Sequence, residues 1–336
     1  MNSTIYFNKQ IGVGILRDRI AAFRGSKHFE LKHVTDHVIA AIAVPGTGSL
    51  GNATIIDLGD ATMVVDTFLT PQAASDLKEA ATSITGRPVT YVVNTHWHSD
   101  HTSGNQVFVP EALIISTTAT REIMDTFSRQ RIAQYRENTE QMNQAIHQQE
   151  IQLQQETDEK LKREMAWDNA SDREFMQMLP DLIHTVPAIT FNQQMVIHGS
   201  QCTVQLLTFG GGHTQSDTIL YIPEEKIVIT GDLVLSKHHP VLANANPQEW
   251  RRILEQIEQL GVETIIPGHG DVCSLQELHD VKGYIQDMLA LVTEAVKTKQ
   301  SIDDIEVPHN YKEWSFTTYF KSNLSKIHTL ITESET

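Results

Sequence analysis

The sequence has few of the residues that would build a disulfide scaffold or a membrane span. Its only two cysteines, Cys202 and Cys273, share no short-spaced motif. This pattern argues against a disulfide framework or a CxxC zinc site, and we expect each cysteine to be a small buried residue. No run of about 18 apolar residues is present either, so no membrane-spanning helix and no membrane partner are expected.

The N-terminal stretch Met1–Ile20 lacks the features of a secretory signal peptide. Charged and polar residues are mixed throughout it, without a basic start, a long apolar stretch or a small-residue cleavage site. We therefore expect a cytoplasmic protein.

Positive charge is also scarce. Lysine and arginine together number 26 against 42 aspartates and glutamates, which gives a formal net charge of −16 with neutral histidines. General nucleic-acid binding needs a basic surface that neutralises phosphates, so no nucleic-acid partner is expected. The apolar fraction of 40% and the charged fraction of 20% are ordinary for a globular protein with a real core.

Two parts of the chain repeat one order of elements. In the first part, apolar runs and turn residues predict three strands over 37–46, 52–59 and 61–68. A helix is predicted over 71–86 and a further strand over 88–96. In the second part, a hairpin is predicted over 217–223 and 225–232, a helix over 247–261 and a strand over 262–270. Two such units can pack sheet on sheet with helices outside, so that loops at matching strand ends meet at one edge.

The segment 120–180 differs from both units. It is rich in Gln, Glu, Lys and Met, and its apolar residues recur at spacings near three and four, at Tyr135, Met142, Ile146 and Leu153. This pattern predicts a helical insertion. It could be a solvated arm, a lid over a site or a homodimer contact. A coiled coil is disfavoured because Thr139 and Gln149 occupy stripe positions. Two further helices are predicted near the C-terminus, over 283–297 and 311–331.

The strongest chemical signal is the motif NTHWHSDHTSGN. It places His96, His98, Asp100 and His101 within six residues, directly after a predicted strand. Zinc is commonly bound by imidazole nitrogen and carboxylate oxygen. Alternate residues of an extended segment point the same way, so the first two histidines can chelate one ion. A turn after them could direct Asp100 and His101 toward a second ion.

Three weaker signals follow along the chain. His213 comes after three glycines in FGGGHTQSDT, Asp232 ends VITGD, and His269 lies between glycines in IIPGHGD. Each alone is as consistent with an ordinary loop residue as with a metal ligand. Their order, each at a strand-to-loop junction, strengthens all of them. Seven donors suit two ions that share one carboxylate and a bridging water.

These motifs, HWHSDH, GGHTQSD, ITGD and PGHGD, resemble those of the metallo-β-lactamase superfamily in type and order. The match extends from about residue 54 to 279, without the helical insertion. The resemblance implies an α/β fold, a four-layer αββα sandwich formed by one domain over residues 1–336, with the insertion and the C-terminal helices added to it. It also implies a first metal site formed by His96, His98 and His213. A second metal site would be formed by Asp100, His101 and His269. Asp232 would be the bridging ligand.

Four more residues are candidates around this site. Asp66 matches a position that orients ligand imidazoles in many relatives. His238 and His239 follow the metal-bearing strand, are candidates for the substrate pocket, and would bind an anionic substrate if protonated. Lys237 is also a pocket candidate, but some lactamases place a carboxylate-binding lysine three residues beyond their cysteine ligand, whereas Lys237 lies five beyond Asp232.

The resemblance implies an enzyme, a metal-dependent hydrolase with two divalent ions. Zinc is favoured, and iron or manganese also suit the ligands. A bridging hydroxide would attack a small acyl substrate, an ester, thioester, lactone or β-lactam, while Asp100 orients the nucleophile. Because the bridging position carries Asp232 and not cysteine, the match favours the glyoxalase II and lactonase branches, and β-lactam turnover is expected to be weak or nil. The alternatives are an iron-dependent enzyme similar to persulfide dioxygenases and a nucleic-acid phosphodiesterase.

Overall fold

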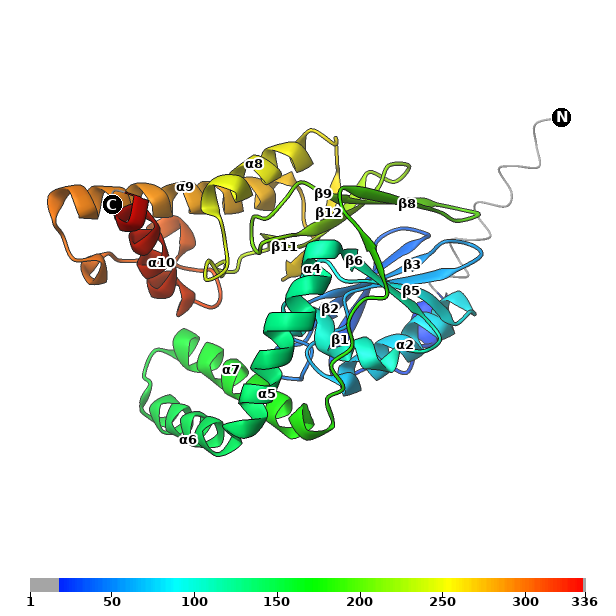
Figure 1. Cartoon of the computed structure of the whole chain (residues 1–336), viewed down its shortest axis with the longest axis horizontal. Coiled ribbons are helices and arrows are strands. Elements are labelled where there is room, and N and C mark those ends of the chain that lie inside the picture. The colour runs from blue at the N-terminus through cyan, green and yellow to red at the C-terminus, as the bar shows by residue number, and fades with distance from the viewer. Residues whose placement is uncertain (1–17, 335–336) are drawn as a thin grey trace.

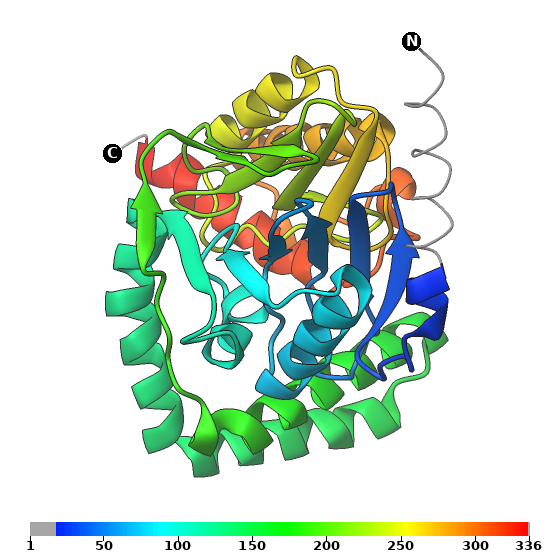
Figure 2. The same ribbon diagram turned by 90° about the vertical axis from the view of Figure 1, so that its right-hand side faces the viewer.

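In the computed structural model, which describes residues 18–334, two β-sheets face each other and helices cover their outer faces (Figures 1 and 2). This arrangement is the predicted αββα sandwich. Most of the N-terminal stretch used to predict the absence of a signal peptide lies outside the described residues. None of the helices in the described part of the chain has the length and apolar character that a bilayer crossing requires.

The first sheet has seven strands in sequential order: β1 (Phe29–His33), β2 (Val38–Ala43), β3 (Ala53–Asp57), β4 (Thr62–Val65), β5 (Val89–Val93), β6 (Leu113–Thr117) and β7 (Ile189–Phe191). The second sheet has the order β12 (Thr264–His269), β11 (Ile227–Leu235), β10 (Thr218–Ile222), β9 (Thr203–Thr208) and β8 (Gln194–His198). The helices that cover or join the sheets are α2 (Pro71–Thr85), α3 (Ser99–Thr102), α8 (Pro247–Glu258), α9 (Leu275–Thr298) and α10 (Tyr319–Ser334).

Strand β2 shows how the layers form. Successive side chains of a strand point to opposite faces of its sheet. Val38 and Ala40 therefore pack between the sheets, whereas Ile39 and Ala41 pack beneath α2. Because both faces of the sheet are covered, this strand is apolar throughout.

The two helices predicted to follow the hairpins begin as expected. The Thr70 side chain accepts a hydrogen bond from the backbone N–H of Ala73 at the start of α2, and Asn246 does the same for Glu249 at the start of α8. Helix α2 ends at Gly86, whose φ of 73° is left-handed and suits glycine.

Three boundaries predicted from the sequence were wrong. The helix predicted over 283–297 begins eight residues earlier, at Leu275. Strand β11 does not end at Asp232 but continues to Leu235, because register shifts against β12 let the strand bend at Gly231, where φ is 51°. The helix predicted over 311–331 begins only at Tyr319.

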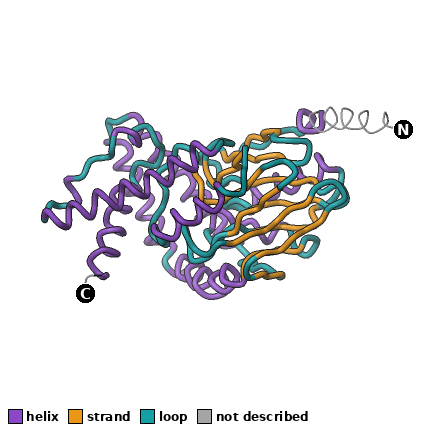
Figure 3. The backbone as a smooth tube through the Cα atoms, turned by 90° about the horizontal axis from the view of Figure 1, so that it is seen from above, coloured by secondary structure: helices purple, strands orange, loops and turns teal. Residues whose placement is uncertain are grey.

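The segment predicted to be a helical insertion leaves β6 and returns at β7. It consists of α4 (Thr118–Ile123), one π-helical segment (Met124–Ser128), α5 (Arg129–Glu137), α6 (Thr139–Gln155) and α7 (Glu159–Met178). Figure 3 shows many of the helices gathered at one end of the molecule and the strands at the other. A small apolar cluster joins the insertion to the loop at Leu69 and consists of Leu69, Phe175, Met178, Leu179 and Leu182.

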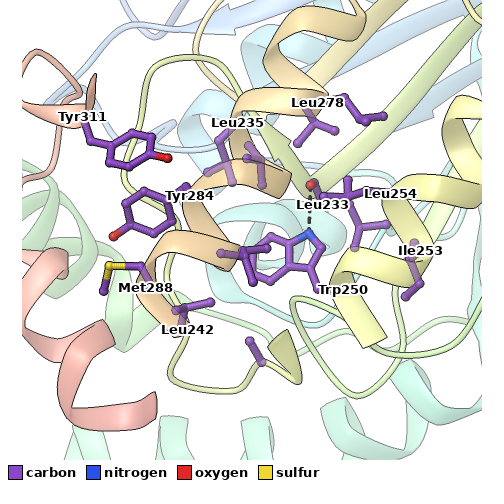
Figure 4. Packing of buried hydrophobic residues seen from close by; sticks show 14 of the residues in the cluster. Leu233, Leu235, Leu242, Trp250, Ile253, Leu254, Leu278, Tyr284, Met288 and Tyr311 are labelled. Carbon is purple, nitrogen blue, oxygen red and sulfur yellow. Dashed lines mark hydrogen bonds between the residues drawn. The ribbon is translucent and has the colours of Figure 1, made fainter. Parts of the chain in front are cut away.

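Trp250 of α8 anchors the outer helix layer to β11. Its indole N–H donates a hydrogen bond of 2.9 Å to the carbonyl of Leu233, and its side chain is fully buried among apolar neighbours (Figure 4). The ring also lies edge-on to His213, with 5.3 Å between centroids. The same residue therefore supports the core and the loop that carries one candidate ligand.

We expect Trp250→Ala to lower the free energy of unfolding by about 3–5 kcal/mol, because it leaves a large cavity. Trp250→Phe should cost about 1–3 kcal/mol, because it leaves the carbonyl of Leu233 unpaired. Urea denaturation measures both. The control Glu255→Ala changes another residue of α8 and removes a surface ion pair with Lys282. It should cost less than about 1 kcal/mol. Equal effects of the alanine variants at 250 and 255 would contradict the anchoring role.

Candidate metal centre

The seven candidate ligands come together at one end of the two sheets. The loop after β5 and the short helix α3 carry His96, His98, Asp100 and His101. The loop between β9 and β10, the bend of β11 and the end of β12 carry His213, Asp232 and His269. Segments that are far apart in the sequence thus place their donors in one site.

The donor atoms form two groups. In the first, the nearest donor atoms of His96, His98, His213 and Asp232 lie within 4.8 Å of one another; in the second, those of Asp100, His101 and His269 do.

Asp232 lies between the two groups. Its Oδ2 is 3.3 Å from Nε2 of His213 and 3.3 Å from Nε2 of His269, and its Oδ1 is 3.2 Å from Nε2 of His101. One carboxylate therefore contacts both sets of imidazoles.

Several of these atoms make close contacts with one another but no hydrogen bond of acceptable geometry. Nε2 of His96, Nε2 of His101 and Oδ1 of Asp232 are buried and unpaired among the described residues. Buried polar atoms are normally paired, so a group of unpaired ones that converge fits a bound cation. Gly268 leaves the room that this arrangement needs, because a Cβ there would lie 2.0 Å from Oδ1 of Asp232. The residues present therefore fit two metal ions.

Carboxylates and imidazoles lie close together in the site and shift one another's pKa. Although burial favours the neutral acid, His269 and His101 hold the pKa of Asp232 well below its ordinary value. Burial alone would lower the pKa of His269, but Asp232 and Asp100 raise it to about 10. Burial lowers the pKa of His213 to about 3. An anionic carboxylate among imidazoles is a donor set that suits a divalent cation.

Asp66 contacts the segment after β5 that carries four of the candidate ligands. Its Oδ2 lies 2.8 Å from Nδ1 of His101, which leaves Nε2 of that ring directed at the site. Its two oxygens also accept hydrogen bonds from the backbone N–H and the hydroxyl of Thr95, each at 2.8 Å. The position predicted from the resemblance to orient a ligand imidazole is therefore in contact with one.

Two further positioning residues were missed from the sequence. Oδ1 of Asn244 lies 3.2 Å from Nε2 of His98, so the other ring nitrogen faces the site. The carboxylate of Asp217 accepts backbone N–H bonds from 212, 213 and 214 and so fixes the loop of His213. Asp217 had a signal, an aspartate four residues after a glycine-flanked histidine, whereas nothing near Asn244 in the sequence indicates its role.

A cavity of about 320 Å³ opens over the site and shows where the three pocket candidates lie. His238 lines it and stacks on Phe316 at 5.2 Å. His239 also borders it, but its ring is buried, with Nδ1 3.2 Å from the hydroxyl of Tyr284. Lys237 is exposed and lies outside the cavity lining, so its inclusion as a pocket residue was wrong.

The surroundings of His238 and His239 favour neutral rings and so do not support a protonated histidine pair. Burial lowers the pKa of His238 to about 4, and burial together with the charge of Lys160 lowers that of His239 to about 4. Both rings are therefore neutral near pH 7.

We expect Asp66→Ala to weaken metal binding about 10- to 100-fold, because His101 loses the partner that orients it. Competition against a chromogenic chelator measures the affinity. The control Asp60→Ala changes an exposed carboxylate in the turn between β3 and β4 and should leave the affinity unchanged. An unchanged affinity in Asp66→Ala would show that the contact does not support the site.

Comparisons with known proteins identify the fold and the family. Solved structures with the same fold include a metallo-beta-lactamase from Pontibacter korlensis, which is 17% identical and has a TM-score of 0.55, with 77% of this chain and 99% of that chain covered. DIM-1 metallo-beta-lactamase exposed to ceftazidime is 16% identical, with a TM-score of 0.54 and coverage of 79% and 99%. FIM-1 from Pseudomonas aeruginosa in its mono-zinc form is 14% identical, with a TM-score of 0.54 and coverage of 77% and 96%.

At these identities the likeness to solved structures concerns the fold. The family is shown by the sequence model of the metallo-beta-lactamase superfamily, which matches residues 46–269, more than half of the chain. The matched range includes all seven candidate ligands and ends at the last of them, His269. The chain therefore belongs to the metallo-beta-lactamase superfamily.

Proposed function

We propose that this protein is a hydrolase that cleaves a small acyl substrate, an ester, thioester or lactone, with the help of two divalent metal ions. The observation that carries the proposal is the carboxylate of Asp232 between two sets of imidazoles, with unpaired buried donor atoms around it. Zinc is the metal we propose, because imidazole nitrogen and carboxylate oxygen are its common ligands.

Each candidate ligand has a role in the proposed reaction. His96, His98 and His213 would hold one ion. Asp100, His101 and His269 would hold the other, and Asp232 would contact both. When bound, such a pair polarises the substrate and makes hydroxide available near neutral pH. Asp100 lines the cavity, which supports the proposal that its carboxylate would orient the attacking water and accept its proton.

The shape of the cavity supports a small substrate with an apolar part. Its volume is at the lower end for sites that bind small molecules. Beside the polar site, its walls are formed by apolar and aromatic side chains, including Leu50, Trp97, Ile132, Tyr135, Phe175, Leu182, Ile183 and Phe316. Several of these belong to the insertion. We therefore propose that the insertion serves as a wall of the substrate cavity and not mainly as a dimer contact.

His96→Ala and Asp232→Ala should abolish both activity and metal loading while the chain stays folded, because each removes a donor from the centre of the site. A panel of ester, thioester, lactone, β-lactam and phosphodiester substrates, assayed with zinc, manganese or iron, measures activity. Elemental analysis measures loading and circular dichroism checks the fold. An active, metal-free Asp232→Ala protein would refute the proposal. Oxygen uptake by an iron-loaded protein would favour the dioxygenase alternative instead.

Ile132→Trp should narrow the cavity and lower kcat/KM for bulky acyl groups about tenfold more than for acetyl groups, because one overfilled contact in a pocket costs about 1–3 kcal/mol. Steady-state kinetics with esters of increasing acyl length measures the ratio. The matched control is Ala133→Trp, one residue along α5, which is exposed and outside the cavity lining. The same change in both variants would argue against the insertion as a cavity wall.

A further inference from the structure

Residues beyond the matched family range also reach the cavity. The ligand set and the family match both end at His269, yet Phe316 and Tyr319 line the same cavity as His238 and Asp100. They belong to the segment 311–319, which is not helical between the short turn that ends at its first residue and the start of α10 at Tyr319. The C-terminal part of the chain thus adds side chains to the site that the superfamily motifs do not include.

The segment 311–319 is attached to the core beside the metal site. The backbone N–H of Ser315 donates to the carbonyl of Lys237 at 2.9 Å, and the N–H of His239 donates to the carbonyl of Ser315 at 3.0 Å. These bonds form an isolated parallel bridge just beyond β11. At the next residue the backbone turns sharply, because Phe316 has a left-handed φ of 60°, which costs free energy for a residue with a side chain.

The insertion holds the other side of the segment. The carboxylate of Glu164 on α7, only 1% exposed, accepts a 3.0 Å hydrogen bond from the backbone N–H of Thr317. Nζ of Lys160, one turn earlier, donates to the carbonyl of Trp314 at 2.6 Å and to the hydroxyl of Thr317 at 3.1 Å. In Figure 1, the start of α10 lies near α7. We call Glu164 and Lys160 the α7 clamp.

The Tyr319 hydroxyl differs from the other phenols nearby. The hydroxyl of Tyr311 donates to Asp287 at 2.6 Å, and that of Tyr284 lies 3.1 Å from Nδ2 of Asn323. No hydrogen bond joins the hydroxyl of Tyr319 to another residue in the described range 18–334, although its side chain lines the cavity. Burial, followed by the charges of Asp168 and Asp100, raises its pKa, so the O–H group keeps its proton.

We propose that the Tyr319 hydroxyl donates a hydrogen bond to the carbonyl oxygen of the bound acyl substrate, and that the α7 clamp positions it. The inference rests on the proposed hydrolase function and adds a donor that strengthens as negative charge develops on that oxygen. The insertion would then have a second role besides forming a wall of the cavity, because its helix α7 contacts the segment 311–319 and positions it beside the site.

The test compares Tyr319→Phe with Tyr311→Phe, using an ester that the wild-type protein hydrolyses. Tyr319→Phe should lower kcat/KM about 10- to 100-fold, mainly in kcat, with unchanged metal content, because the lost donor acts in the transition state. It should also weaken binding of a phosphonate analogue of the ester. Tyr311→Phe removes a phenol of the same segment that is outside the cavity lining and should keep activity within about twofold. A fully active Tyr319→Phe would overturn the inference, whereas a metal-loaded wild type without any esterase, thioesterase or lactonase activity would overturn the proposed function.

A double-mutant cycle tests the α7 clamp. Glu164→Ala should lower kcat in the wild-type background but add no loss in the Tyr319→Phe background, since both changes remove one interaction. Glu164→Gln keeps an oxygen acceptor for Thr317 and should restore most of the activity. If the alanine variant does not fold, Lys160→Met serves in the same cycle. Equal losses in both backgrounds would show that the clamp has only a structural role and would refute its positioning of Tyr319.

Discussion

The arrangement of the site depends on one carboxylate. Asp232 lies between two groups of imidazoles, and the local backbone is built to keep it there. Strand β11 bends at Gly231 and continues beyond Asp232, which moves the carboxylate out of a regular strand position. The neighbouring strand passes at Gly268, where any side chain would collide with Oδ1. Gly231 and Gly268 are therefore explained by the backbone conformation and the space that this residue requires.

The sequence predicted most of the layer architecture, because apolar periodicity and turn residues are local signals. It also predicted which seven side chains come together, because the seven candidate donors stand in short motifs at strand ends. It failed where tertiary contacts override local pattern. The stretch 311–318 has helical apolar spacing, but pairing with the Lys237–His239 loop and the contacts of Glu164 hold it in an extended and turned form. No local rule indicates such contacts.

The same reason explains the errors around the pocket. Lys237 is near Asp232 in sequence, but its left-handed backbone at φ 56° turns the chain, and its side chain is exposed outside the cavity. Conversely, Asn244 is twelve residues beyond Asp232 and reaches His98 only because the loop folds back. Distance along the chain was thus a poor guide to the substrate side of the site, although it was a good guide to the donors within each motif.

The donors are divided between the two sheets. His96, His98, Asp100 and His101 follow the first sheet, whereas His213, Asp232 and His269 belong to the second. Backbone hydrogen bonds that join the halves beside the site include Asn52 N–H to the carbonyl of Gly268 and Thr218 N–H to the carbonyl of Thr95. A bound ion would therefore act as a cross-link between the halves of the molecule. The melting temperature would then rise with the concentration of free metal, since only the folded chain presents the complete chelate.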